Sequence, residues 1–201
     1  GTRLEAQEIQ GTIVDMDGAL FRAEDLARAR AGGHRPDHLD RIVVAVDPPV
    51  TATGDACGIV VVGRRDDRAY VLADRSVRGK TPQGWTDRVA RIVEEFAADQ
   101  VVAETNQGGE LVSTMLDQAG CRGKVKRVHA SCGKVARAEP VAALYEQGRV
   151  VHCGDFPELS EELMALGADE TRRSPDRADA LVWAVTELLL KRPGRPRVRV
   201  L

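Results

Sequence analysis

The chain has 201 residues, of which 43% are hydrophobic and 30% are charged, a composition typical of one folded domain and not of a disordered chain. Its 29 lysines and arginines are balanced by 31 acids, so no overall positive field exists, and any binding to nucleic acid must depend on local basic patches. Aromatic residues make up only 3%, which argues against base stacking as the mode of binding.

The cysteines and the hydropathy pattern narrow the class of protein further. The four cysteines form no CxxC pair and have no regular spacing with histidine, so we expect a reduced, cytosolic protein without a zinc site. We find no signal peptide and no apolar run of membrane-spanning length, and therefore expect no membrane partner. The chain begins with Gly1 instead of Met, which suggests a piece of a longer protein.

Residues 1–40 differ in character from the rest of the chain. Their first part and residues 15–31 have helical character, and the GGHRPDH sequence that follows breaks the pattern with glycine and proline. We therefore expect a helical interdomain segment at 1–40, followed by the main domain at 41–190.

Three β-strands are predicted next, at residues 41–47, 57–63 and 69–77. Each is a short run rich in valine, alanine and isoleucine, and a short RRDDR turn joins the last two. Connections this short predict an antiparallel meander.

Asp47 ends the first of these strands, where a buried carboxylate is costly unless it is paired. The PPVTATGDACG turn that follows would bring Asp55 back toward the same place. One alternative to a functional role is that Asp47 simply begins a turn, where aspartate is common. Another is the phosphate-binding loop of actin-like ATPases, which is weakened here because Pro48 and Pro49 remove two backbone donors.

Helices and strands alternate in the remainder of the chain. We predict strands at 99–105 and 124–130, and helices within 81–99 and at 109–119, 134–147, 157–166 and 176–190. Thr81 is the expected N-cap of the first of these helices and Pro82 its first residue. Crossover connections of this kind imply parallel strands. The predicted fold class is therefore an α/β, ribonuclease H-like mixed sheet, with three antiparallel strands and then parallel strands, flanked by helices. In this arrangement the first strand lies beside the fourth.

Glu104 ends the fourth predicted strand and would therefore lie beside Asp47. Functional groups of open α/β sheets gather outside the carboxyl ends of strands, although an exposed loop acid is the alternative.

Asp179 lies in the last predicted helix, for which we expect Ser174 as N-cap and Pro175 as first residue. Its neighbours are small or apolar, so its carboxylate needs a partner, either Arg177 or a metal ion. Considered together with Asp47 and Glu104, we favour the metal ion: the three acids would share a divalent cation, because such ions prefer carboxylate oxygens.

Basic residues that could contact DNA phosphates are Lys134 and Arg137, near the start of a predicted helix, and Arg177. Solvent-facing side chains are the alternative. Residues 191–201 contain five basic residues and no acid, and are predicted to be a basic tail.

Several motifs together resemble the C-terminal nuclease domain of the large terminase subunit of tailed bacteriophages and prophages. They are VAVDPPVTATGDACGIVVVG, YVLADRSVRG, VVAETNQGGELV, KVKRVHASCGKVARAEPVAALYEQGRVVH and SPDRADALVWAVTELLL, which occur in the family's order and spacing over residues 41–190. The resemblance implies an endonuclease that cuts concatemeric double-stranded viral DNA during genome packaging. It also implies that Asp47, Glu104 and Asp179 are the catalytic, metal-binding triad, with Asp55 as an accessory acid.

The resemblance further implies two Mg²⁺ or Mn²⁺ ions, with Asp47 shared between them. The implied partners are double-stranded DNA, the terminase ATPase domain, the small terminase subunit and the portal protein, in the cytoplasm of the bacterial host. No Walker motif is present, so we expect no ATP hydrolysis from this chain. Two alternatives remain open: a Holliday-junction resolvase or transposase relative, and a non-catalytic module that docks on the portal or the ATPase.

Overall fold

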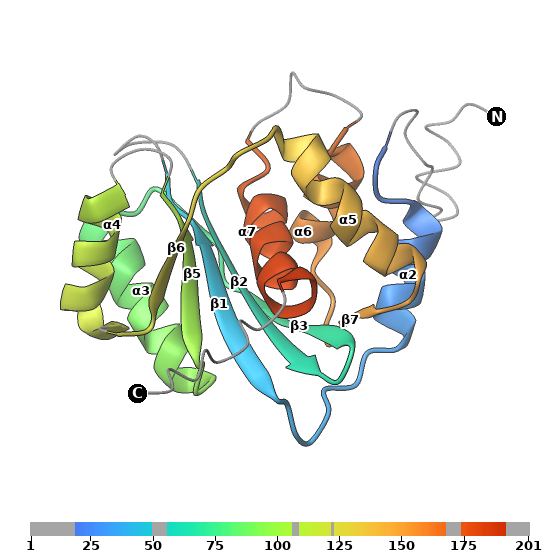
Figure 1. Ribbon diagram of the computed structural model, residues 1–201, viewed down its shortest axis with the longest axis horizontal. Helices are drawn as coiled ribbons and strands as arrows, with labels where there is room; N and C mark the ends of the chain where they lie inside the picture. Colours follow the sequence, from blue (N-terminus) through green and yellow to red (C-terminus); the bar gives the residue numbers. More distant parts are fainter. Residues whose placement is uncertain (1–18, 50–55, 106–108, 122, 168–173, 192–201) are drawn as a thin grey trace, which may run out of the picture.

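A seven-stranded mixed sheet with helices on both faces forms the centre of the molecule (Figure 1). The computed structural model describes residues 19–49, 56–105, 109–121, 123–167 and 174–191. The strands are β1 (Arg41–Asp47), β2 (Ala56–Arg65), β3 (Arg68–Asp74), β4 (Val77–Arg78), β5 (Gln100–Glu104), β6 (Val125–Val128) and β7 (Val150–His152).

The order of the strands is β6-β5-β1-β2-β3-β7, with β4 paired to β2 outside this path. Strands β1, β2 and β3 are antiparallel, whereas β5 runs parallel to β1, and β6 parallel to β5. The predicted ribonuclease H-like order is confirmed, including the position of the first strand beside the fourth. Because Val46 pairs with Ala103, the residues that follow them, Asp47 and Glu104, end adjacent strands at the same edge.

Two details of the sheet differ from the prediction. The third predicted strand is divided, because the backbone N–H and the hydroxyl of Ser76 both donate to Asp74 Oδ1, and β4 then pairs with the opposite end of β2. Strand β7 was not predicted, since three buried residues are too few to show a period. It pairs in parallel with β3.

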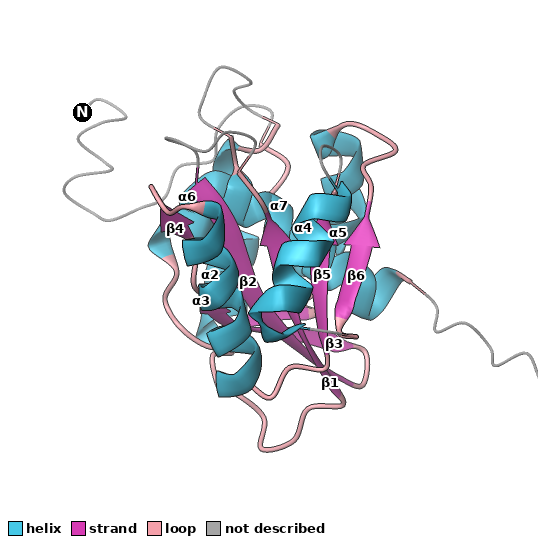
Figure 2. Cartoon of the chain, turned by 90° about the vertical axis from the view of Figure 1, so that its left-hand side faces the viewer, coloured by secondary structure: helices cyan, strands magenta, loops and turns pink. Residues whose placement is uncertain are grey.

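The helices are α2 (Ala23–Ala31), α3 (Pro82–Glu95), α4 (Gly109–Leu116), α5 (Lys134–Glu146), α6 (Pro157–Ala165) and α7 (Asp176–Val185), and the π-helical turn η2 (Thr186–Leu190) continues α7. Helices α3 and α4 cover one face of the sheet, and α2, α5, α6 and α7 cover the other (Figures 1 and 2). Since both faces are covered, the central strands are almost continuously apolar.

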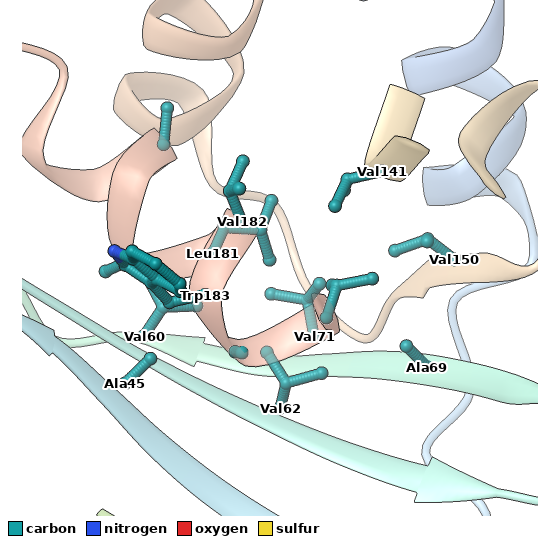
Figure 3. Packing of buried hydrophobic residues seen from close by; sticks show 14 of the residues in the cluster. Ala45, Val60, Val62, Ala69, Val71, Val141, Val150, Leu181, Val182 and Trp183 are labelled. Atoms are coloured by element: carbon teal, nitrogen blue, oxygen red, sulfur yellow. The ribbon is translucent and has the colours of Figure 1, made fainter. Parts of the chain in front are cut away.

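Alternate residues of each central strand point into the two cores. Val44 and Ile59 pack with Trp85 of α3 in one of them. On the other face, Val60 packs with Leu181, beside the indole ring of Trp183 (Figure 3). Helix α7 therefore lies directly on β1 and β2.

Gly58 allows the start of α7 to approach the sheet closely. It pairs with Asp47, and a Cβ atom added to it would lie 1.9 Å from the carbonyl oxygen of Asp176. Only glycine permits this contact between backbones. The first turn of α7 is therefore positioned over the end of β1.

The predicted cap of α7 is wrong. The helix begins at Asp176, with Pro175 in the cap position and no side-chain cap bond. Glu162 of α6 supplies the missing acceptor, since its Oε2 accepts from the backbone N–H groups of Arg177 (2.7 Å) and Ala178 (3.2 Å). The predicted cap of α3 is confirmed, because Thr81 Oγ1 accepts from Gly84 N at 3.2 Å.

The structure describes only parts of the two segments that flank the main domain, residues 1–40 and 191–201. Helix α2 lies in the second half of the predicted interdomain segment, where Phe21 and Leu26 join the core beside Tyr145. Residues 1–18 and almost all of the predicted basic tail lie outside the described residues. No helix in the described ranges is long and apolar enough to cross a bilayer.

Candidate active site

Three of the predicted acids meet at one edge of the sheet. Asp47 ends β1, Glu104 ends the neighbouring β5, and Asp179 lies at the start of α7 above them. Burial raises the pKa of Asp47 well above its ordinary value, and the negative charges of Asp179, Glu104 and Asp176 raise it further. The carboxylates therefore lie within electrostatic reach of one another. Asp55 lies outside the described residues.

Both carboxylate oxygens of Asp179 are bound by cations from α5. Arg137 Nη2 donates to Oδ1 at 2.6 Å, and Lys134 Nζ lies 2.6 Å from Oδ2. The Asp179 side chain is 2% exposed, so these cations offset much of the cost of burying its charge. Burial alone would lower the pKa of Lys134, but the hydrogen bond to Asp179 and the nearby acids raise it above its usual value.

Glu104 is held by Trp183, which lies one helical turn after Asp179 on α7. The indole Nε1–H donates to Glu104 Oε2 at 2.6 Å. Arg137 Nη2 lies 3.8 Å from the same oxygen, and the Arg137 guanidinium stacks 4.7 Å from the centre of the Trp183 ring. Arg137 therefore bridges Glu104 and Asp179, and both acids have fixed positions.

Arg177, the third basic residue predicted to contact DNA, has acidic partners outside this cluster. Its Nε donates to Asp74 Oδ2 at 2.9 Å and its Nη1 to Glu162 Oε1 at 3.2 Å, and its side chain is 12% exposed. The two alternatives for the partner of Asp179 were Arg177 and a metal ion. Arg177 is not the partner of Asp179, since the protein side chains on Asp179 are Lys134 and Arg137, and the metal ion stays a prediction.

Trp183 was not predicted to belong to this cluster. The position of Trp183 in the sequence could have predicted this contact. Residues four apart lie on the same face of a helix, so Trp183 faces the same way as Asp179. An indole N–H needs an acceptor when it is buried, and the predicted triad offers one.

The acids suit a divalent metal ion by their donor chemistry. Asp47, Glu104 and Asp179 offer carboxylate oxygens, which Mg²⁺ and Mn²⁺ prefer, and the other acids raise the pKa of Asp47 although Lys134 and Arg137 lie nearby. Among the described residues, no three His, Cys, Asp or Glu side chains are already arranged around one ion position.

The fold and these acids define a class of protein. A mixed sheet in ribonuclease H-like order has carboxylates at the ends of its two central neighbouring strands, and a helix that crosses the sheet adds a third. The sequence matches the terminase RNaseH-like domain family over residues 44–188. The chain therefore belongs to this family.

Solved structures with the same fold include several large terminases. The nuclease domain of the large terminase subunit of bacterial virus Sf6 is 15% identical, with a TM-score of 0.62 over 82% of this chain and 96% of that one. The large terminase nuclease of the thermophilic phage G20c is 19% identical, with a TM-score of 0.57 over 77% and 85%. At such identities the likeness supports the fold alone.

A large terminase from another thermophilic bacteriophage is 15% identical, with a TM-score of 0.63. The match covers 94% of this chain but only 50% of the phage protein, so the chain spans about half its length. The G20c nuclease is also known with bound zinc and with bound cobalt. No curated protein matches the sequence significantly.

Proposed function

We propose that the chain is a metal-dependent endonuclease that cuts concatemeric double-stranded viral DNA during genome packaging. The observation that carries this proposal is the meeting of Asp47, Glu104 and Asp179 at one edge of the sheet, where burial and the other acids raise the pKa of Asp47 well above its ordinary value. Membership of the terminase RNaseH-like family and the metal-bound relative support it.

The three acids would hold two Mg²⁺ or Mn²⁺ ions, with Asp47 shared between them. Bound ions of this kind activate a water molecule and stabilise the oxygen that leaves the phosphate. The chain supplies the rigid frame: Asp47 and Glu104 end paired central strands, and Trp183 fixes one Glu104 oxygen. A metal ligand that is held in this way needs little reorganisation when the ion binds.

Lys134 is the residue that we propose for contact with the DNA backbone near the cut, whereas Arg137 is 8% exposed and held between Asp179 and Glu104. The chain has few aromatic residues, so we expect little preference for sequence and strong weakening of binding by salt. The ATPase domain, the small subunit and the portal are proposed partners, in the cytoplasm of the bacterial host, and selection of the cut site would belong to one of them. We expect no ATP hydrolysis from this chain.

The test is cleavage of supercoiled plasmid in Mg²⁺, in Mn²⁺ and in EDTA, with Asp47→Ala beside the wild type. We expect nicking and linearisation in the metals, none in EDTA and none by the variant, whose folding circular dichroism would verify. A folded wild-type chain that cleaves nothing in either metal would contradict an independent nuclease and favour the docking module. A strong preference for branched over linear DNA would favour the resolvase alternative.

A further inference from the structure

The contact between Lys134 and Asp179 conflicts with a role of Asp179 in binding a metal. Each carboxylate oxygen of Asp179 lies 2.6 Å from a protein cation. A protein cation at this distance repels a divalent ion that approaches the same oxygen and takes up part of its negative charge. Metal binding at Asp179 is therefore favoured when one of the two cations moves away.

The two cations differ in how easily they can leave. The Arg137 side chain is 8% exposed, stacks on Trp183 and lies between Asp179 and Glu104. The Lys134 side chain is 45% exposed, at the first turn of α5, and its Nζ also donates a hydrogen bond of 3.2 Å to the exposed Ser174 hydroxyl. A lysine ammonium on a flexible stem can move into solvent at little cost. Lys134 is thus the cation that is more easily displaced.

We propose that Lys134 is an exchangeable cation, which neutralises Asp179 when no metal is bound and moves to a DNA phosphate when a divalent ion takes its place. This inference rests on the proposed function and adds a form of regulation to it. The displaced ammonium would lie beside new positive charge, and a phosphate that enters the site would offer it an anion.

Coupling between metal and DNA follows from this exchange. In the absence of metal, Lys134 is occupied by Asp179 and contributes little to DNA binding. Once it is released, it adds a phosphate contact, so metal strengthens DNA binding, and DNA must strengthen metal binding by the same factor. An acidic cluster that is neutralised by its own lysine would also take up metal weakly until DNA arrives.

The first measurement is calorimetric titration of Mn²⁺ into the DNA-free chain, with Lys134→Met compared with Lys126→Met. Lys126 is a matched control: its side chain is 39% exposed, and its Nζ lies 2.8 Å from Glu187, a carboxylate that is 3% exposed. We expect Lys134→Met to bind Mn²⁺ about tenfold more tightly than the wild type, since about 1.4 kcal/mol of competition is removed. Lys126→Met should bind as the wild type does. Equal or weaker binding by Lys134→Met would overturn the proposal.

The second measurement is the salt dependence of binding to a DNA duplex, in Ca²⁺ and in EDTA, with the duplex checked for cleavage. One additional phosphate contact steepens the slope of log K against log salt by about 0.9. We expect this increment on addition of Ca²⁺ for the wild type and for Lys126→Met, but not for Lys134→Met. An increment of equal size in all three proteins would overturn the proposal.

These outcomes separate the exchange from the nuclease itself. If the wild type binds Mn²⁺ and Lys134→Met binds it equally, only the exchange fails. If neither protein binds Mn²⁺, the proposed metal-dependent nuclease fails together with it. If only Lys134→Met binds Mn²⁺, the exchange is supported in its strongest form.

Discussion

The last helix of the domain contains two buried acids whose surroundings differ. Asp179 lies at the start of α7 and Glu187 in η2, two turns further on, with side chains that are 2% and 3% exposed. Glu187 is surrounded by cations, with ion pairs to Arg41 (3.3 Å), Lys126 (2.8 Å) and Lys191 (3.6 Å). Cations therefore outnumber the acid at this end of the helix.

The opposite balance holds around Asp179. Lys134 and Arg137 are shared there among Asp179, Glu104 and Asp47, and the pKa of Asp47 is raised in part by the charges of the other acids. Both ends of this helix therefore contain a buried acid, so burial alone does not identify a metal-binding site. The excess of acid over neighbouring cations distinguishes the end that suits a metal ion.

The largest difference between the two ends of the helix is expected when Asp179 and Glu187 are each replaced by the corresponding amide. Asp179→Asn should abolish Mn²⁺-dependent plasmid cleavage, because an amide is a poor ligand for a hard cation. Glu187→Gln should retain cleavage at any temperature at which it stays folded. Loss of cleavage in both variants, with both folded, would remove the distinction between the ends.

Stability without metal should change in opposite directions at the two ends. In EDTA, Glu187→Gln should lower the free energy of unfolding by about 1–3 kcal/mol, since it leaves buried donors without a charged acceptor. Asp47→Asn, in contrast, should raise the free energy of unfolding.

The pKa of Asp47 is raised in the folded state, so the contribution of this carboxyl group to stability is present at low pH and is lost as pH rises through that pKa. The gain in Asp47→Asn should therefore be larger at neutral than at acidic pH, as measured by urea unfolding. A destabilised Asp47→Asn at neutral pH would contradict the account.

Trp183→Phe should weaken Mn²⁺ binding by about tenfold, because it removes the donor that orients Glu104 while keeping an aromatic ring beside Arg137. Trp85→Phe is the matched control, since Trp85 is buried in the core on the opposite face of the sheet. Calorimetry of both variants measures the difference. Equal affinities would show that the Trp183 hydrogen bond does not position the metal ligand.

Arg177→Met should have the smallest effect on the site. Arg177 is paired with Asp74 and Glu162, so its loss should destabilise the packing of α6 against α7 and leave affinity for DNA unchanged. Fluorescence anisotropy with a labelled duplex in Ca²⁺ tests this, with Lys134→Met for comparison. A loss of affinity equal to that of Lys134→Met would restore Arg177 as a DNA contact.

The sequence was sufficient to predict the order of the sheet and the acids at its edge. Valine-rich runs and strong punctuation by glycine and proline mark β1, β2 and β5, and the topology then puts Asp47 beside Glu104. Strand β7 was missed because it is very short, and its pairing with β3 depends on the rest of the fold.

The partners of the acids could not be predicted in the same way. The cap of α7 comes from Glu162 on another helix, and no local motif marks such a contact. Lys134 and Arg137 were predicted to contact DNA phosphates, and the structure shows them on Asp179. Contacts between side chains that lie more than forty residues apart depend on how α5 packs beside α7.

The most direct test of the account is anomalous diffraction from crystals of the chain soaked in Mn²⁺. We predict anomalous density in contact with Asp47, Glu104 and Asp179, with Lys134 Nζ withdrawn from Asp179 and Glu187 unchanged. The absence of density among these three acids, at an Mn²⁺ concentration that supports cleavage, would contradict the central claim that the excess of acid at this end of α7 is a metal site.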